Sequence, residues 1–150
     1  MLTTDDSSVE QARATAEVVR GLLRAHGVAG ELTLTGGSSL PGLLTKGDID
    51  LHLRVSAADF ADVVERLRGI ADAAHPEIWT DTFATFERIQ EPIVGIAVTV
   101  VGSEHDTRFT SGWAHLAEHA DAREEYNALK RRVEYEAEKS RFFDTISAAS

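Results

Sequence analysis

A nine-residue run of almost only apolar side chains, IVGIAVTVV at positions 93–101, constrains the fold of this chain most. Its valines and isoleucines favour a β-strand, and a strand without polar alternation is typical of the centre of a sheet, where both faces are covered. We therefore expect a sheet built around this run. The length of 150 residues suits a single domain, 1–150, and the 43% hydrophobic content is that of an ordinary globular protein.

Three further segments carry the signals of strands. ELTLT (31–35) and DIDLHLRV (48–55) alternate polar and apolar residues, as strands with one buried face do. FATFERIQ (83–90) is joined to the apolar run by a tight turn at Glu91–Pro92. One face of DIDLHLRV is apolar, and the other carries Asp48, Asp50, His52 and Arg54.

Helical periodicity flanks these strands. Residues 7–28 place apolar side chains on one stripe, and Gly27 is a suitable stop. A second helix is expected over 57–71, capped by Ser56, and the pattern is helical from 104 to the end. This order of elements predicts an α+β fold, a mixed sheet with flanking helices.

The acidic charge narrows the range of functions. The net charge is −10, with 25 acidic and 15 basic residues, whereas proteins that bind nucleic acid gain affinity by neutralising phosphates. A nucleic-acid partner is therefore unlikely on charge grounds, and a small, metal-complexed phosphate ligand suits the chain better. Without cysteine, the chain has no disulfides, thiolate zinc sites or cysteine nucleophiles. It shows no signal sequence or membrane-length apolar run, so we expect a cytoplasmic protein without membrane contact.

The residues before the second strand carry the candidate phosphate chemistry. In TGGSSLPGLLTKGDIDL (35–51), Gly36 and Gly37 let the backbone approach a phosphate, and Ser38 and Ser39 offer hydroxyl donors. Lys46 is a point charge for a phosphate oxygen.

The acids that follow carry the candidate metal chemistry. Asp48 and Asp50 stand two residues apart, so on a strand they share a face with α-carbons roughly 6.5 Å apart. Two such carboxylates can converge on Mg²⁺. The alternative interpretation is a sharp turn with a solvated acid pair, for which glycine, serine, proline and aspartate are equally typical.

These residues resemble a known family. One sequence pattern resembles the nucleotidyltransferase superfamily that includes DNA polymerase beta. In this pattern a strand ends in Gly-Gly, and two alternate aspartates follow about ten residues later on the next strand. Within it GGSSLPGLLTKGDIDL is most similar to the GrpB family, whose pattern runs roughly GSTSVPGLxAKPxIDI. EEYNALKRRV and YEAEKSRFFDTI resemble that family's C-terminal helices.

The resemblance implies a nucleotidyltransferase-like fold with C-terminal helices, and Mg²⁺-dependent transfer of a nucleoside monophosphate from an NTP to a small-molecule acceptor. It implies that the metal-binding and catalytic residues are Asp48 and Asp50. Asp50 matches the aspartate that the GrpB family retains. Many GrpB members have an apolar residue at the position of Asp48, so at this position the chain is more similar to the catalytic pattern of the wider superfamily. It implies that the triphosphate lies against Gly36, Gly37, Ser38, Ser39, Lys46 and, near the C-terminus, Lys139. Lys130 and Arg141 match or neighbour the same basic positions, although solvated helix residues paired with glutamates explain them equally well.

One departure from the pattern leaves the function open. The superfamily places a third acid on a later strand, and GrpB proteins often show histidines there, but residues 93–101 contain neither. The nearest acids in sequence are Glu87, Glu91 and Glu104. Two functions follow: a nucleotidyltransferase, or a catalytically degenerate nucleotide- or metal-binding module. A scaffold whose loop only turns the chain is a third.

Three other features have mainly structural interpretations. HLAEH (115–119) matches the inverted zinc-protease motif, but such a protease needs a third ligand and a larger scaffold, so we interpret it as exposed histidines beside acids. His52 is expected to be a hydrogen-bonded structural residue or to line the site. Trp79 and Trp113 are expected to be core or rim anchors.

Overall fold

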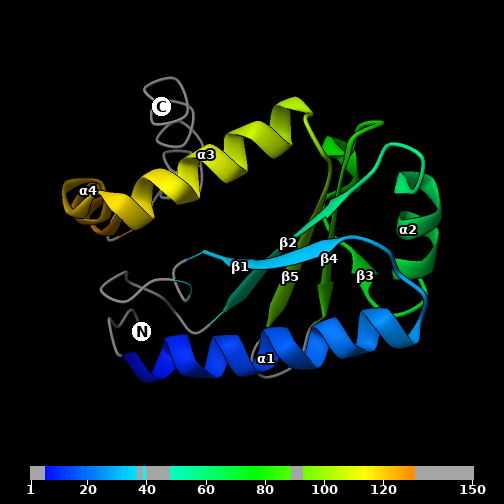
Figure 1. The fold of residues 1–150 in the computed structure, drawn as a ribbon, viewed down its shortest axis with the longest axis horizontal. Helices are drawn as coiled ribbons and strands as arrows, with labels where there is room; N and C mark the ends of the chain where they lie inside the picture. The colour runs from blue at the N-terminus through cyan, green and yellow to red at the C-terminus, as the bar shows by residue number, and fades with distance from the viewer. Residues whose placement is uncertain (1–5, 37–38, 40–47, 89–92, 131–150) are drawn as a thin grey trace.

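The structure is a computed structural model that describes residues 6–36, 39, 48–88 and 93–130 (Figure 1). Its helices are α1 (Asp6–Ala25), α2 (Phe60–Leu67), α3 (Glu104–Glu118) and α4 (Ala120–Lys130), with a short 3₁₀ helix at Pro76–Ile78. Its strands are β1 (Glu31–Thr35), β2 (Ile49–Val55), β3 (Asp72–Ala73), β4 (Phe83–Arg88) and β5 (Val94–Val100).

The strands form one mixed sheet in the order β1-β2-β5-β4-β3. Only β2 and β5 run parallel, and the other neighbouring pairs are antiparallel. The apolar run therefore occupies the middle of the sheet, as its composition predicts. The expected α+β fold class is confirmed.

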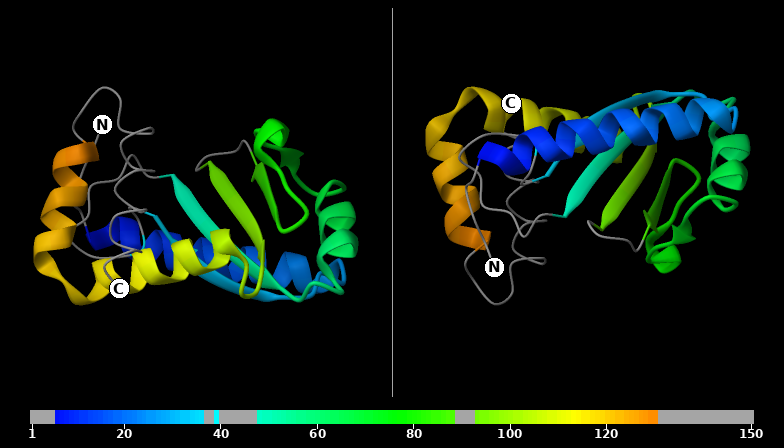
Figure 2. Two further views of the ribbon diagram at one scale, coloured as in Figure 1. Left: turned by 90° about the horizontal axis from the view of Figure 1, so that it is seen from above. Right: turned by 90° about the horizontal axis from the view of Figure 1, so that it is seen from below.

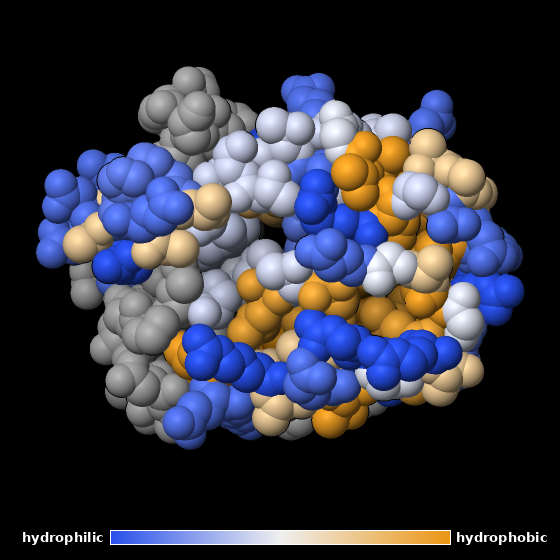
Figure 3. Space-filling model, in the orientation of Figure 1, coloured by the Kyte–Doolittle hydropathy of each residue, from blue (hydrophilic) through white to orange (hydrophobic). Residues whose placement is uncertain are grey.

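The hydrophobic core lies on one face of the sheet. The apolar side of β2 and the matching residues of β4 and β5 pack against α1 and α2. The most deeply buried of these side chains include Leu51, Leu53, Val63, Leu67, Phe86 and Val98. Figure 3 shows hydrophilic side chains along the outer side of α1, with hydrophobic ones in the band between this helix and the sheet.

The other face of the sheet lies beneath α3. Figures 1 and 2 show α1 and α3 on opposite sides of the strands, with α4 continuing beyond the end of α3. Leu116 of α3 packs with Ala122 and Tyr126 of α4, and the Trp113 and Tyr126 rings meet edge to face at 5.7 Å. Trp113 is thus a rim anchor, as expected. No helix in the described ranges is both long and apolar enough to cross a membrane.

Two local predictions need correction. The expected second helix spans 57–71, but α2 begins at Phe60, because Ser56 and Asp59 form their own turn, and it ends at Leu67. In that turn the Asp59 amide donates to Ser56 Oγ at 3.2 Å, and the Ser56 hydroxyl donates to the Asp59 carboxylate at 2.9 Å. The short strand β3 has no sequence signal, because two residues carry no periodicity. Gly27 does end α1, with a φ of 69°.

Candidate functional site

Pairing of β1 with β2 brings the predicted glycine loop to the predicted acid. Thr35, the last residue of β1, pairs with Asp50 of β2, so Gly36 stands beside the Asp50 side chain. Asp48 directly precedes β2 and is exposed, whereas Asp50 is half-buried. Ser39 donates its hydroxyl to the Gly36 carbonyl at 2.6 Å, which closes a tight turn. The predicted residues Gly37, Ser38, Lys46 and Lys139, and the side chain of Lys130, lie outside the described residues.

The Asp50 carboxylate lies between two glycines. A Cβ built on Gly36 would stand 2.9 Å from Asp50 Cγ and closer still to Oδ2, and Gly36 has a φ of 77°. A Cβ on Gly95 of β5 would stand 3.4 Å from Asp50 Oδ1. Gly36 is therefore required twice, for its backbone conformation and for the space that the carboxylate occupies.

A second carboxylate shares the same row of the sheet. Asp50 pairs with Gly95, and Gly95 pairs with Glu87 of β4, so both acids project from the same face. Two strand spacings separate them, roughly 9.5 Å between α-carbons. Of the three acids nearest in sequence, Glu87 is thus the one that faces Asp50. Glu91 lies outside the described residues, and Glu104 is exposed at the start of α3.

A cleft of about 430 Å³ opens between this row and α3. Its floor is made by small residues of the central strand, Gly95 and Ala97, with Thr85 of β4 beside them. Asp50 and Glu87 line it at the end where the row lies. Such a cavity, mostly apolar with a few polar groups, is typical of small-molecule sites.

Aromatic side chains of α3 form the roof of the cleft. His105, Phe109 and Trp113 are spaced four residues apart, so they share one face of the helix, and all three are half-buried. The His105 ring stacks on Phe83 with 4.1 Å between centroids and 9° between planes. Burial lowers the pKa of His105, which keeps the ring neutral near pH 7. The sequence signal for this aromatic stripe is the four-residue spacing of His105, Phe109 and Trp113.

A buried polar network fixes α3 to the sheet. Asp106 in its first turn is 2% exposed and accepts two hydrogen bonds from the Arg54 guanidinium, at 2.7 and 2.9 Å. It also accepts from the Gly102 amide at 2.9 Å and the Thr99 hydroxyl at 3.1 Å. Burial raises the pKa of Asp106, but these bonds outweigh it and bring the pKa to about 2. Asp106 is therefore a charged anchor.

His52 belongs to that network. Because the Thr99 hydroxyl donates to Asp106, its oxygen accepts from His52 Nε2 at 2.7 Å. Burial lowers the pKa of His52 to about 4, although nearby Asp106 acts in the opposite direction. The ring is thus neutral at pH 7, which agrees with the structural interpretation. It also borders a second cavity of about 330 Å³ beneath the other side of α3.

The second cavity adjoins the cleft. The two share Thr35, Phe109 and Trp113, and the second one adds Ser39 and the hydroxyls of Thr33 and Thr110. Two spaces for small molecules therefore lie on either side of the aromatic stripe, next to the turn at Gly36.

The donor set near Asp50 fits magnesium better than a transition metal. Among the residues that the structure describes, no three histidine, aspartate or glutamate side chains gather as a metal site. Mg²⁺ keeps several waters and takes one or two carboxylates together with substrate phosphates, and Asp48 and Asp50 can supply such oxygens.

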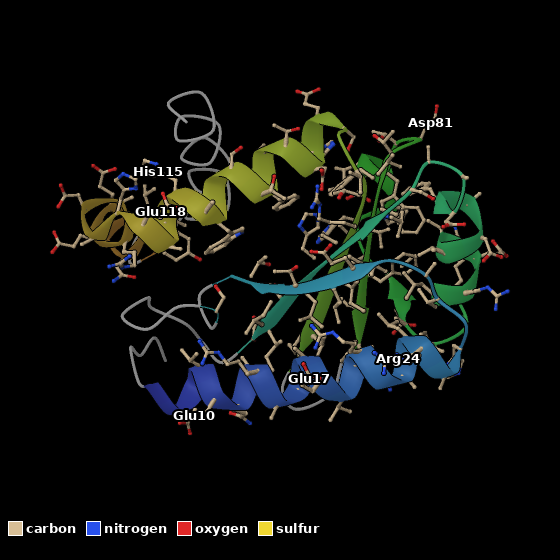
Figure 4. The ribbon with its side chains drawn as sticks, viewed as in Figure 1. Glu10, Glu17, Arg24, Asp81, His115 and Glu118 are labelled. Atoms are coloured by element: carbon tan, nitrogen blue, oxygen red, sulfur yellow. The ribbon has the colours of Figure 1, made fainter. Side chains whose placement is uncertain are left out.

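At the other end of α3, the His115 and His119 rings stack at 4.2 Å, and His115 and Glu118 lie toward α4 (Figure 4).

Comparisons with known proteins agree with this fold. A family model described as GrpB protein matches residues 2–148. The crystal structure of the conserved protein GrpB from Enterococcus faecalis superposes with a TM-score of 0.73 at 16% identity, and the match covers 99% of this chain and 96% of that one. None of the curated proteins compared with the chain matches it significantly.

Proposed function

This chain belongs to the GrpB family, which makes it nucleotidyltransferase-like in general, and on that premise we propose that it binds a magnesium–NTP complex in the cleft under α3. We further propose that it transfers the nucleoside monophosphate to a small-molecule acceptor. The observation that carries the proposal is the Asp50 carboxylate between Gly36 and Gly95, at the junction of the cleft and the turn that follows β1.

Each part of the site has a role in this proposal. Gly36, which lies against the Asp50 carboxylate, and Ser39, which donates to the Gly36 carbonyl, would line the place where the phosphate chain lies. Asp50 and Asp48 would hold Mg²⁺, which neutralises phosphate charge when bound. The adjoining cavity beside Ser39 and Thr33 would hold the acceptor. In the transfer, the acceptor oxygen bonds to the α-phosphorus, the bond to the bridging oxygen breaks, and pyrophosphate and one proton leave.

A second function is favoured by a specific observation. The strand parallel to β2 places Gly95 and Ala97, not an acid, opposite Asp50 and His52. A superfamily enzyme would be expected to carry its third carboxylate there, so a binding module without turnover is the alternative.

Thermal unfolding tests nucleotide binding. A ligand at 100 times its dissociation constant adds about 2.7 kcal/mol of stability, so magnesium with a suitable NTP should raise the Tm, and D50N should lose that rise. D81N is the matched control, because Asp81 is exposed in the turn before β4, away from the cleft (Figure 4). No shift with any NTP would reject the proposal.

Turnover is tested separately. Pyrophosphate release is measured with the bound NTP across a panel of small alcohols and polyols. Release that depends on an acceptor and disappears in D50N supports the transferase. Clear NTP binding with a silent panel supports the binding module.

A further inference from the structure

We propose that the cleft under α3 binds the base of the nucleotide and selects guanine, because Glu87 accepts hydrogen bonds from the edge of the base. The inference rests on the proposed function, since it takes the ligand to be a nucleotide. It adds which side of the cleft, that of β4, receives the edge of the base and which base fits it.

The shape of the cleft suits a flat ring. Its floor is low at Gly95 and Ala97, where neighbouring positions carry larger side chains, and its roof is made by the rings of Phe109 and Trp113. A base can stack beneath such rings, but stacking alone does not select among bases because every base has a π-face. Selection has to come from polar groups at the edge of the slot.

One polar group on the floor is already engaged. The Thr85 hydroxyl lies within hydrogen-bond distance of the Ala74 carbonyl and accepts from Trp79 Nε1 at 3.2 Å. Asp50 is held against Gly36 at the end of the row where the phosphate turn lies. On the β4 side of the row, the Glu87 side chain has no hydrogen bond or ion pair with any other residue that the structure describes. Its two carboxylate oxygens are therefore acceptors without donors among those residues.

A carboxylate selects guanine by its donor pattern. Guanine presents N1–H and N2–H side by side, which match two carboxylate oxygens in a charge-assisted bidentate pair. Adenine and cytosine place one donor next to an acceptor, and uracil places one donor between two acceptors. The polarity of the row also fits a nucleotide, since Asp50 and the Gly36 turn stand at one end for phosphate and metal, and Glu87 stands at the other for the base.

Affinities of the full-length chain for GTP and ITP, with magnesium, test this directly. ITP differs from GTP only by lacking the N2 amino group. GTP should bind at least about tenfold more tightly than ITP, as a bidentate pair with a base typically discriminates. E87Q should reduce this ratio to about one, because an amide offers one acceptor and a donor that opposes N2–H.

Two further variants keep the result interpretable. E65Q, on an exposed residue of α2 on the far face of the sheet, should leave the GTP to ITP ratio unchanged. A97L fills the floor and should weaken all NTPs at least tenfold, while circular dichroism and the Tm without ligand show that the fold is intact.

The outcomes separate the two proposals. If the wild type binds NTPs without preferring GTP over ITP, or if E87Q and A97L leave binding unchanged, the base lies elsewhere and this inference fails while nucleotide binding stands. If an acceptor molecule occupies the cleft in place of the base, this inference also fails and nucleotide binding stands. If the wild type binds no NTP, both proposals fail.

Discussion

At the scale of single residues, two glycines determine where the acid of the site lies. Gly36 and Gly95 have no side chain, and the Asp50 carboxylate occupies the space between them. Glycine before an acidic strand is usually explained by the approach of a phosphate to the backbone. Here the group that lies against Gly36 is the protein's own Asp50 carboxylate, so Gly36 sets the position of this acid.

Replacing Gly36 by alanine should therefore damage the site more than the fold. The positive φ costs about 1 kcal/mol for a residue with a Cβ, and the new methyl group would displace the Asp50 side chain. We expect a loss of about 1–2 kcal/mol in the free energy of unfolding and loss of the magnesium–NTP shift in Tm. Urea titration and thermal melts measure the two effects.

G21A is the matched control for that substitution. Gly21 lies within α1, and nothing stands within 4 Å of a Cβ built on it, so alanine should stabilise the helix by about 0.5–1 kcal/mol. A G36A protein with wild-type nucleotide shifts would show that Asp50 does not depend on Gly36 for its position.

The sequence identified these residues but not their geometry. Spacing and residue type are enough to single out Gly36 and Asp50, because alternation on a strand fixes the face of each side chain. The pairing of Glu87 with Gly95 follows from the register between β4 and β5, which depends on the whole sheet. The expected roles of Asp48, Asp50 and the loop residues stay predictions.

At the scale of elements, α3 turns an open sheet face into a cleft. It is held mainly at its first turn, where Ser103 caps the helix by accepting from the Asp106 amide and where Asp106 binds Arg54 and Thr99. Periodicity predicted a helix here, and the apolar run predicted the middle position of β5. Neither could predict the anchor, because Arg54 and Asp106 are 52 residues apart in the chain.

Removing this anchor should loosen α3 from the sheet. D106A leaves Arg54, Thr99 and the Gly102 amide without their shared acceptor, and breaking such a buried pair costs about 3 kcal/mol. We expect that loss in urea unfolding, together with weaker NTP binding because the aromatic roof is no longer fixed.

T107A, which alters the exposed neighbour of Asp106, should change stability by less than about 0.5 kcal/mol. If D106A and T107A behave alike, the network does not anchor the helix.

At the scale of the whole molecule, the two faces of the sheet have different chemistry. The face toward α1 and α2 is an apolar core, while the face toward α3 buries a histidine, a threonine and an aspartate together. An apolar core is insensitive to pH, so the response of this protein to acid should originate under α3. The largest shifts there are those of His52 and Asp106, and burial also lowers the pKa of His105.

Acid should therefore destabilise the fold in two steps. The folded pKa of His52, about 4, lies below its ordinary value of 6.5, so the unfolded chain takes up the proton first. Its contribution is complete above pH 6.5 and is lost as the pH falls toward 4, a change on the order of 3 kcal/mol. Asp106 follows as the pH falls from about 4 to about 2.

Urea unfolding at a series of pH values should show the first loss in the wild type and in H26Q, an exposed control. H52Q removes the titrating ring but keeps an N–H for Thr99, so its loss of stability between pH 6.5 and 4 should be much smaller than that of the wild type, and the remainder should come from His105. An equal loss in H52Q would place the acid-sensitive group outside this network.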